Sequence, residues 1–175
     1  MQSVEPLDSQ FIGWLREHRN ILLKIAGSFA TEAAEQADLF QDMAIAVWRS
    51  LPGFNGQSKP STWIYRVCLN TALTWRRSEQ KWRQLQSPLD LVPELSSNSP
   101  LPGRLYEEDE ILRKLYDAIR DLPASERSLL ILMLDGLSYR EISEITGLTE
   151  NRVGVALTRI RKKLAETLRE VRDEL

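Results

Sequence analysis

A stripe of cationic and amide side chains is the feature of this sequence that points most directly to chemistry. At about 100° per residue, a helix over residues 61–81 would carry on one face Arg66, Asn70, Thr74, Arg77 and Lys81. Arginine and lysine bind phosphates, whereas asparagine and threonine can hydrogen-bond to base edges. Trp63 lies beside the stripe near the helix start, where its ring could stack on an unpaired base. This combination indicates binding of single-stranded or melting DNA.

The opposite side of the same helix is apolar and predicts a buried face. Its members are Ile64, Val67, Cys68, Thr71, Ala72 and Trp75. For any single aromatic residue, such as Trp63 or Tyr65, simple packing is the better interpretation. The stripe as a whole, rather than one ring, favours DNA binding.

A second constellation predicts a helix-turn-helix. Ser138 and Glu141 have the spacing of a capping box, which starts a short helix. Gly147 permits a tight turn, and Thr149 would cap the next helix. The apolar face of that helix is Val153, Ala156, Leu157, Ile160, Leu164 and Leu168. Its opposite face is Asn151, Val155, Thr158, Arg159 and Lys162. A second helix of this kind places its first side chains in a major groove and its later cations on phosphates.

The charges are segregated along the chain although the formal net charge is only −2. Residues 59–83 contain six basic residues against Glu79 alone, and residues 152–172 contain seven against Glu166 and Glu170. Acidic residues gather before the first basic segment and again at 107–110. Two solvated helix faces would also explain this pattern, but a local basic stripe is the electrostatic signature of nucleic-acid binding.

The elements that must position these residues are helices in two units. Residues 87–103 contain four prolines and four serines, which excludes a helix or a central strand there. We therefore predict domains at 1–86 and 107–175, joined by a linker at 87–106. Apolar residues recur at helical spacing on both sides of the linker, and strand-like alternation is absent. The predicted fold class is all-α, with helices at 111–122 and 125–134 before the helix-turn-helix.

Composition excludes several other classes of protein. Hydrophobic residues make up 42% and charged residues 27% of the 175 residues, and no apolar run is long enough to span a membrane. One cysteine, Cys68, and one histidine, His18, cannot form an internal disulfide or a tetrahedral zinc site, so we expect no metal and no cofactor. The N-terminus has no features of a secretion signal, and we expect a cytoplasmic protein.

The first unit resembles domain 2 of the extracytoplasmic-function (ECF) sigma factors, a subfamily of the sigma-70 family. The resemblance is carried by residues 38–42, 47–51, 54–56, 61–67 and Asn70. It implies that Asp38, Gln41 and Asp42 bind the clamp helices of the β′ subunit of RNA polymerase. It also implies that residues 54–61, with Phe54, Asn55 and Ser61, pocket a flipped base of the minus-ten element. The residues implied to lie on the DNA side are Trp63, Tyr65, Arg66, Asn70 and Arg77.

The second unit resembles domain 4 of the same sigma factors, through residues 122–127 and 135–142, the latter including Arg140. That resemblance implies recognition of the minus-thirty-five element. The chain departs from many relatives at Gly154, Val155 and Ala156, where arginine or serine is common. Fewer side chains can therefore read base edges through hydrogen bonds. The residues that remain available are Arg140, Asn151, Arg152, Thr158, Arg159 and Lys162. Val155 could meet a thymine methyl group.

The sequence thus predicts a non-enzymatic subunit that directs core polymerase, through its β′ and β subunits, to promoter DNA. An anti-sigma factor is a further partner that the resemblance implies. One alternative is an ordinary regulator whose N-terminal domain senses a ligand, although such a domain should lack the basic stripe. Another is a helical nuclease in which Asp38 and Asp42 bind a metal ion, but no further carboxylate lies at a spacing that would complete such a site.

Overall fold

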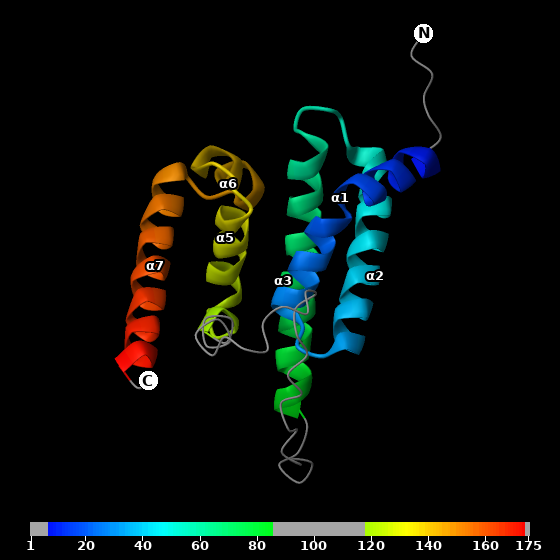
Figure 1. Ribbon diagram of the computed structural model, residues 1–175. Helices are drawn as coiled ribbons and strands as arrows, with labels where there is room; N and C mark the ends of the chain where they lie inside the picture. Colours follow the sequence, from blue (N-terminus) through cyan, green and yellow to red (C-terminus); the bar gives the residue numbers. More distant parts are fainter. Residues whose placement is uncertain (1–6, 86–117, 174–175) are drawn as a thin grey trace. The chain divides into compact units, whose positions relative to one another are not determined.

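The computed structural model describes residues 7–85 and 118–173, and every regular element within these ranges is a helix (Figure 1). The prediction of an all-α fold is confirmed. The chain divides into two compact units whose boundary lies outside the described residues. The predicted linker at 87–106 and residues 111–117 of the predicted helix at 111–122 also lie outside the described residues. Of the rest of that helix, residues 118–120 are helical and residues 121–122 form a turn. The domain limits therefore stay predictions.

The first unit is a three-helix bundle. It contains α1 (Leu7–Phe29), α2 (Ala33–Ser50), the short 3-10 turn η1 (Leu51–Gly53) and α3 (Pro60–Leu85) (Figure 1). Each long helix contacts the other two. The centre is filled by Leu22, Ile25, Leu39, Met43, Ile64 and Cys68, all almost completely buried. Burying one such aliphatic side chain contributes about 1.5–3 kcal/mol, so this core holds the three helices in fixed register.

The second unit contains α5 (Ala124–Leu134), α6 (Tyr139–Thr146) and α7 (Glu150–Asp173). Both α5 and α6 pack against α7, through buried residues that include Leu132, Ile142, Leu157 and Ile160. Val153 completes the predicted apolar face, while Ala156 and Leu164 are half-buried. Helices α6 and α7 thereby form the predicted helix-turn-helix.

The local chemistry that starts and ends these helices matches the sequence analysis. The backbone N–H of Glu141 donates to Ser138 Oγ at 3.3 Å, and the Ser138 N–H donates to Glu141 Oε2 at 3.0 Å, which completes the capping box. Helix α6 ends at Gly147 with φ +75°, a conformation that favours glycine. The Arg152 N–H then donates to Thr149 Oγ1 at 3.3 Å, capping α7 as expected.

A buried arginine of α5 binds the end of the helical segment that precedes it. Arg127 of α5 is only 4% exposed. Its Nη2 donates to the carbonyl oxygen of Leu122 at 3.0 Å and to that of Arg120. These carbonyls end the helical segment that precedes Pro123, where backbone acceptors lack partners within the helix. The sequence motif at 122–127 does not by itself predict this anchoring role of Arg127.

Candidate nucleic-acid interface

Helix α3 has an exposed and a buried face, as the sequence predicts, but the buried face is displaced around the helix: Tyr65 and Leu69 are buried, whereas Val67, Thr71 and Trp75 of the predicted buried face are only half-buried. Ile64, Cys68 and Ala72 are buried against α1 and α2. The five members of the polar stripe, Arg66, Asn70, Thr74, Arg77 and Lys81, are all exposed. Thr74 donates its hydroxyl proton to the Asn70 carbonyl at 2.9 Å, so its side-chain oxygen remains an acceptor for an outside donor. The three-helix core therefore holds this stripe outward.

Tyr65 is a correction to the predicted site. It is only 7% exposed and lies in the core of the first unit, not on the exposed stripe. The reason is geometric: Tyr65 precedes Arg66 by one residue, which rotates it by about 100° toward the bundle. Packing, the alternative interpretation for an individual aromatic residue, holds for Tyr65.

Three aromatic rings fix the loop between α2 and α3. Phe54 stands edge-on to Trp14 of α1 at a centroid distance of 4.8 Å and to Trp63 of α3 at 5.5 Å. Trp63 is half-buried, and its Nε1 donates to Ser50 Oγ at 3.0 Å. Edge-to-face pairs of this kind contribute about 0.5–1.5 kcal/mol beyond area burial. Phe54 and Trp63 therefore anchor the loop in place.

The rest of this loop presents polar groups. Asn55 is exposed, and its Oδ1 accepts the Gln57 N–H at 3.1 Å in a local turn that Gly56 continues with φ +75°. Ser61 is half-buried in the first turn of α3. An anchored loop with exposed polar edges is suited to enclosing a small planar group, because little backbone ordering is left to occur on binding.

The acidic face lies on α2. Asp38, Gln41 and Asp42 are exposed, and the same side of the helix continues into Ile45 and Trp48, which are 46% and 49% exposed. Trp48 Nε1 donates to Asp8 Oδ1 of α1 at 3.4 Å. Exposed aromatic and aliphatic residues flanked by charges are typical of protein-binding surfaces. The resemblance predicts the acidic residues of this face, but not the apolar residues beside them.

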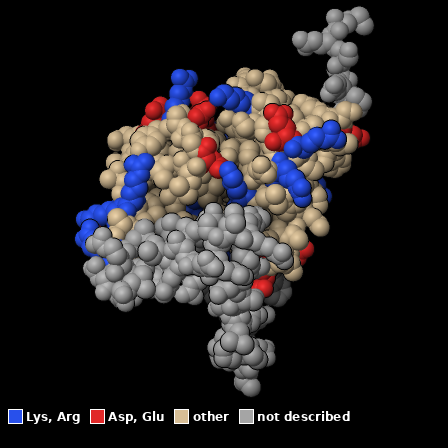
Figure 2. All heavy atoms as spheres, in the orientation of Figure 1, with Lys and Arg blue, Asp and Glu red and all other residues tan. Residues whose placement is uncertain are grey.

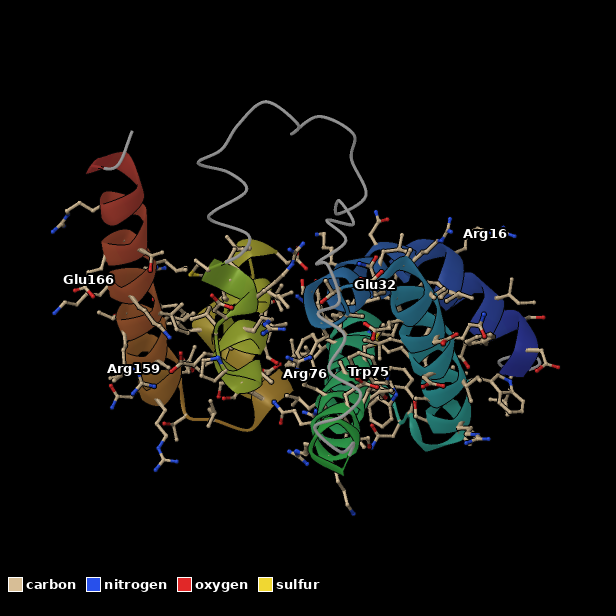
Figure 3. All side chains as sticks on the ribbon, turned by 90° about the horizontal axis from the view of Figure 1, so that it is seen from below. Arg16, Glu32, Trp75, Arg76, Arg159 and Glu166 are labelled. Atoms are coloured by element: carbon tan, nitrogen blue, oxygen red, sulfur yellow. The ribbon has the colours of Figure 1, made fainter. Side chains whose placement is uncertain are left out.

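An open groove joins the two predicted faces of the first unit. It runs between α2 and α3, with a volume of about 570 Å³. Its lining residues include Asp42, Ile45 and Arg49 from α2 and Asn70, Thr74 and Trp75 from α3. Figure 3 labels Trp75 among the side chains of α3. Sequence spacing treats the residues of each helix separately, so it could not show that Asp42 and Asn70 line one groove.

On α7 the predicted DNA-facing residues are exposed: Asn151, Arg152, Val155, Thr158, Arg159 and Lys162. Two of the cations have acidic neighbours. Arg159 Nη2 lies 3.0 Å from Glu126 Oε1 of α5, and Lys162 Nζ lies 4.0 Å from Glu166 Oε1 (Figure 3 labels Arg159 and Glu166). On the face shown in Figure 2, basic and acidic side chains are likewise interspersed. The Lys162–Glu166 pair is exposed on both sides and contributes at most about 1 kcal/mol, so a phosphate can replace Glu166. In the other pair Arg159 is exposed, but the Glu126 side chain is only 19% exposed. Arg140 is exposed at the start of α6 and pairs with Glu144 at 3.4 Å.

A shallow hollow of about 450 Å³ lies at the start of α7. It is lined by Tyr139 of α6 and by Glu150, Asn151, Gly154, Val155 and Thr158 of α7. Neither Tyr139 nor Gly154 is among the site residues predicted from the sequence. Tyr139 is 15 residues from Gly154 along the chain, and only the packing of α6 on α7 brings them together.

The remaining described residues offer no other chemistry of this kind. No cluster of three or more histidine, cysteine, aspartate or glutamate side chains suited to a metal ion occurs within residues 7–85 and 118–173. In the same ranges, no helix combines the length and apolar character needed to cross a membrane.

Comparison with known proteins identifies the class that this fold and these surfaces define. Residues 14–83 match the family model of sigma-70 region 2, and residues 112–164 match that of sigma-70 region 4. The chain therefore belongs to the sigma-70 family, whose members are non-enzymatic transcription initiation factors that direct RNA polymerase to promoters.

Relatives narrow the class further. The chain is 28% identical to RNA polymerase sigma factor NccH of Alcaligenes xylosoxydans xylosoxydans, over 88% of this chain and 84% of that protein. It is also 28% identical to the ECF sigma factor SigX of Bacillus subtilis, over 79% of this chain and 73% of that protein. This protein is an RNA polymerase sigma factor of the ECF subfamily, as the resemblance implied.

Solved structures agree on the fold. The sigma factor RpoE of Bartonella quintana, solved in complex with the anti-sigma factor NepR, aligns with a TM-score of 0.66 at 23% identity, covering 88% of this chain and 95% of that one. CnrH, solved with the cytosolic domain of CnrY, aligns with a TM-score of 0.65 at 20% identity, covering 93% of this chain and 90% of that one.

Proposed function

We propose that the two units carry three binding surfaces, one for RNA polymerase and two for promoter DNA. Asp38, Gln41 and Asp42 of α2 bind the β′ clamp helices of the polymerase. The loop at 54–61 and the stripe of α3 bind the minus-ten element. The minus-thirty-five element is bound by Arg140, Asn151, Arg152, Val155, Thr158, Arg159 and Lys162. The observation that carries the proposal is the exposed stripe on α3, which a buried apolar face holds outward.

Within the first unit, the residues of the stripe have different chemical roles. Asn70 offers both a donor and an acceptor to a base edge, and loss of such a contact costs about 1–3 kcal/mol against the preferred base. Arg77 offers charge to a phosphate, which contributes nearly equally to every sequence. Because Asn70 lines the groove beside α2, a base that it reads would enter the space between the two helices.

Transcription in vitro separates these roles. Purified chain and core polymerase are given a promoter library randomised across the minus-ten element. Asn70→Ala should change the preferred sequence, whereas Arg77→Ala should lower transcription from all promoters and flatten its salt dependence. Arg19→Ala, which removes an exposed arginine from α1, is the matched control and should change neither.

Two results would contradict this assignment. A changed preference in Arg77→Ala with an unchanged one in Asn70→Ala would reverse the two roles. Normal transcription by both variants would mean that α3 does not face DNA. That result would favour the alternative interpretation, an ordinary transcriptional regulator.

Charge reversal tests the polymerase surface. Asp38→Lys/Asp42→Lys should weaken core association by a few kcal/mol where the charges are desolvated, and by less than about 1 kcal/mol at an exposed rim. Glu17→Lys on α1 reverses an exposed charge outside this surface and is the control. A Kd of the double variant for core polymerase equal to that of the wild type would reject the surface.

Work on core polymerase would place this protein in the cytoplasm and give it no catalytic step of its own. We also propose regulation by an anti-sigma factor, supported by the complexes in which RpoE and CnrH were solved. Such a partner should compete with core polymerase for the chain. A ternary complex of all three on size-exclusion chromatography would argue against a competing partner.

A further inference from the structure

The starting point is a close approach between the two helices of the helix-turn-helix. A Cβ atom added to Gly154 would lie 3.3 Å from Cε2 and 3.7 Å from Cδ2 of Tyr139. A longer side chain at position 154 would occupy the space beside the ring. Because residue 154 is glycine, the Tyr139 ring rests directly on the exposed face of α7.

The hollow beside this ring has a definite chemical character. Tyr139 is 38% and Val155 63% exposed, and both line it together with Asn151 and Thr158. None of its lining residues is a cation, and Glu150 stands among them. A carboxylate repels a phosphate, and the absence of arginine or lysine removes the usual partner of guanine. The surface therefore suits an apolar group on a base edge.

We infer that Tyr139, Gly154 and Val155 form a seat for the C5-methyl group of a thymine in the minus-thirty-five element. The thymine methyl is the apolar group that the major groove presents, and apolar side chains distinguish it there. Tyr139 is thus a specificity-determining residue, and Gly154 permits its position. This inference rests on the proposed binding of the minus-thirty-five element by α7.

The test removes the methyl group alone. The full chain assembled with core polymerase is bound to promoter duplexes in which each thymine of the minus-thirty-five element is replaced in turn by deoxyuridine. At one position the wild type should lose about fourfold in affinity, the effect of withdrawing one methyl-sized apolar group from contact. Tyr139→Ala and Val155→Ser should bind the thymine and deoxyuridine duplexes equally. Tyr139→Phe, which keeps the ring, should retain the difference.

Lys162→Ala is the matched control on the same helix. It should weaken binding of both duplexes by the same factor and leave their ratio unchanged, because phosphate contacts carry no base information. Gly154→Ala should reduce the ratio partly, since its new methyl group must displace the Tyr139 ring by a few tenths of an ångström.

The outcomes separate this inference from the proposed function. A thymine-to-deoxyuridine ratio of one at every position in the wild type, with sequence-specific binding intact, overturns the methyl seat alone. A ratio that persists in Tyr139→Ala and Val155→Ser places the methyl contact elsewhere and also overturns it. Loss of all dependence on the minus-thirty-five sequence would instead refute binding of that element by α7. The wild-type measurement needs no variant to fold.

Discussion

Removing the Arg127 guanidinium should unfold the second unit while leaving the first intact. Arg127 is nearly inaccessible and donates to the carbonyl oxygens of Arg120 and Leu122. Arg127→Ala removes both charge-assisted hydrogen bonds and leaves two backbone acceptors without this donor. A hydrogen bond to a charged group contributes about 1.5–3 kcal/mol, so we expect a loss of about 3–5 kcal/mol in the free energy of unfolding. A domain of this size has about 3–5 kcal/mol of stability in total.

The tryptophans give an assay that distinguishes the units. All five lie in the first unit, at positions 14, 48, 63, 75 and 82. Tryptophan fluorescence therefore follows unfolding of the first unit alone, whereas far-UV circular dichroism follows both. In a urea titration, Arg127→Ala should lower the helical signal already at low denaturant and leave the fluorescence transition where it is in the wild type.

Two further variants sharpen this experiment. Arg127→Lys can satisfy one carbonyl but not both, so its loss should be intermediate. Arg169→Ala removes an exposed arginine from the same unit and should change stability by less than about 0.5 kcal/mol. An Arg127→Ala chain whose circular dichroism transition coincides with that of the wild type would refute the anchoring role.

Three other perturbations have defined outcomes. Burial raises the pKa of the Cys68 thiol to about 12 from an ordinary value of 9.0, so the folded state keeps a proton that the unfolded state loses. The free energy of unfolding should therefore fall between about pH 9 and 12 by up to about 1.4 kcal/mol per pH unit more steeply in the wild type than in Cys68→Ala, measured by denaturant titration. The same pH dependence in both proteins would contradict this. Glu126→Gln removes the ionic partner of Arg159 and should raise the affinity of the chain for duplex DNA a few-fold at low salt, but less at physiological salt, in a fluorescence anisotropy titration; an unchanged affinity would mean that Arg159 does not reach phosphate. Gly147→Ala places a side chain at φ +75° and should destabilise the second unit by about 1–2 kcal/mol by circular dichroism, and an unaltered midpoint would show that the turn relaxes.

Features set by local periodicity and capping could be predicted from the sequence. The exposed and buried faces of α3 follow from a period of 3.6 residues, which needs no knowledge of the partner helices. The capping box at Ser138 and the left-handed turn at Gly147 depend on residues within one turn of each other. The same reasoning located α7 and its exposed face before any packing was known.

Features that depend on packing between distant segments could not be predicted in this way. The Trp14–Phe54–Trp63 cluster joins a loop to two helices, and the α2–α3 groove needs the angle between those helices. The motif places Tyr65 on the DNA side, although its rotation from Arg66 buries it. Tyr139 became a site residue only because α6 packs over Gly154.

The charges on α7 also explain why recognition should require the assembled polymerase. Arg159 and Lys162 have carboxylate neighbours, so part of their attraction for phosphate is offset before DNA arrives. The second unit alone should then bind duplex DNA weakly and with strong salt dependence. If the first unit holds the minus-ten element as proposed, the contact of the second unit becomes intramolecular. Its strength then depends on the effective concentration of the second unit near the DNA as well as on its intrinsic affinity. Weak individual contacts favour specificity, because a promoter that lacks either element cannot be held by the other unit alone.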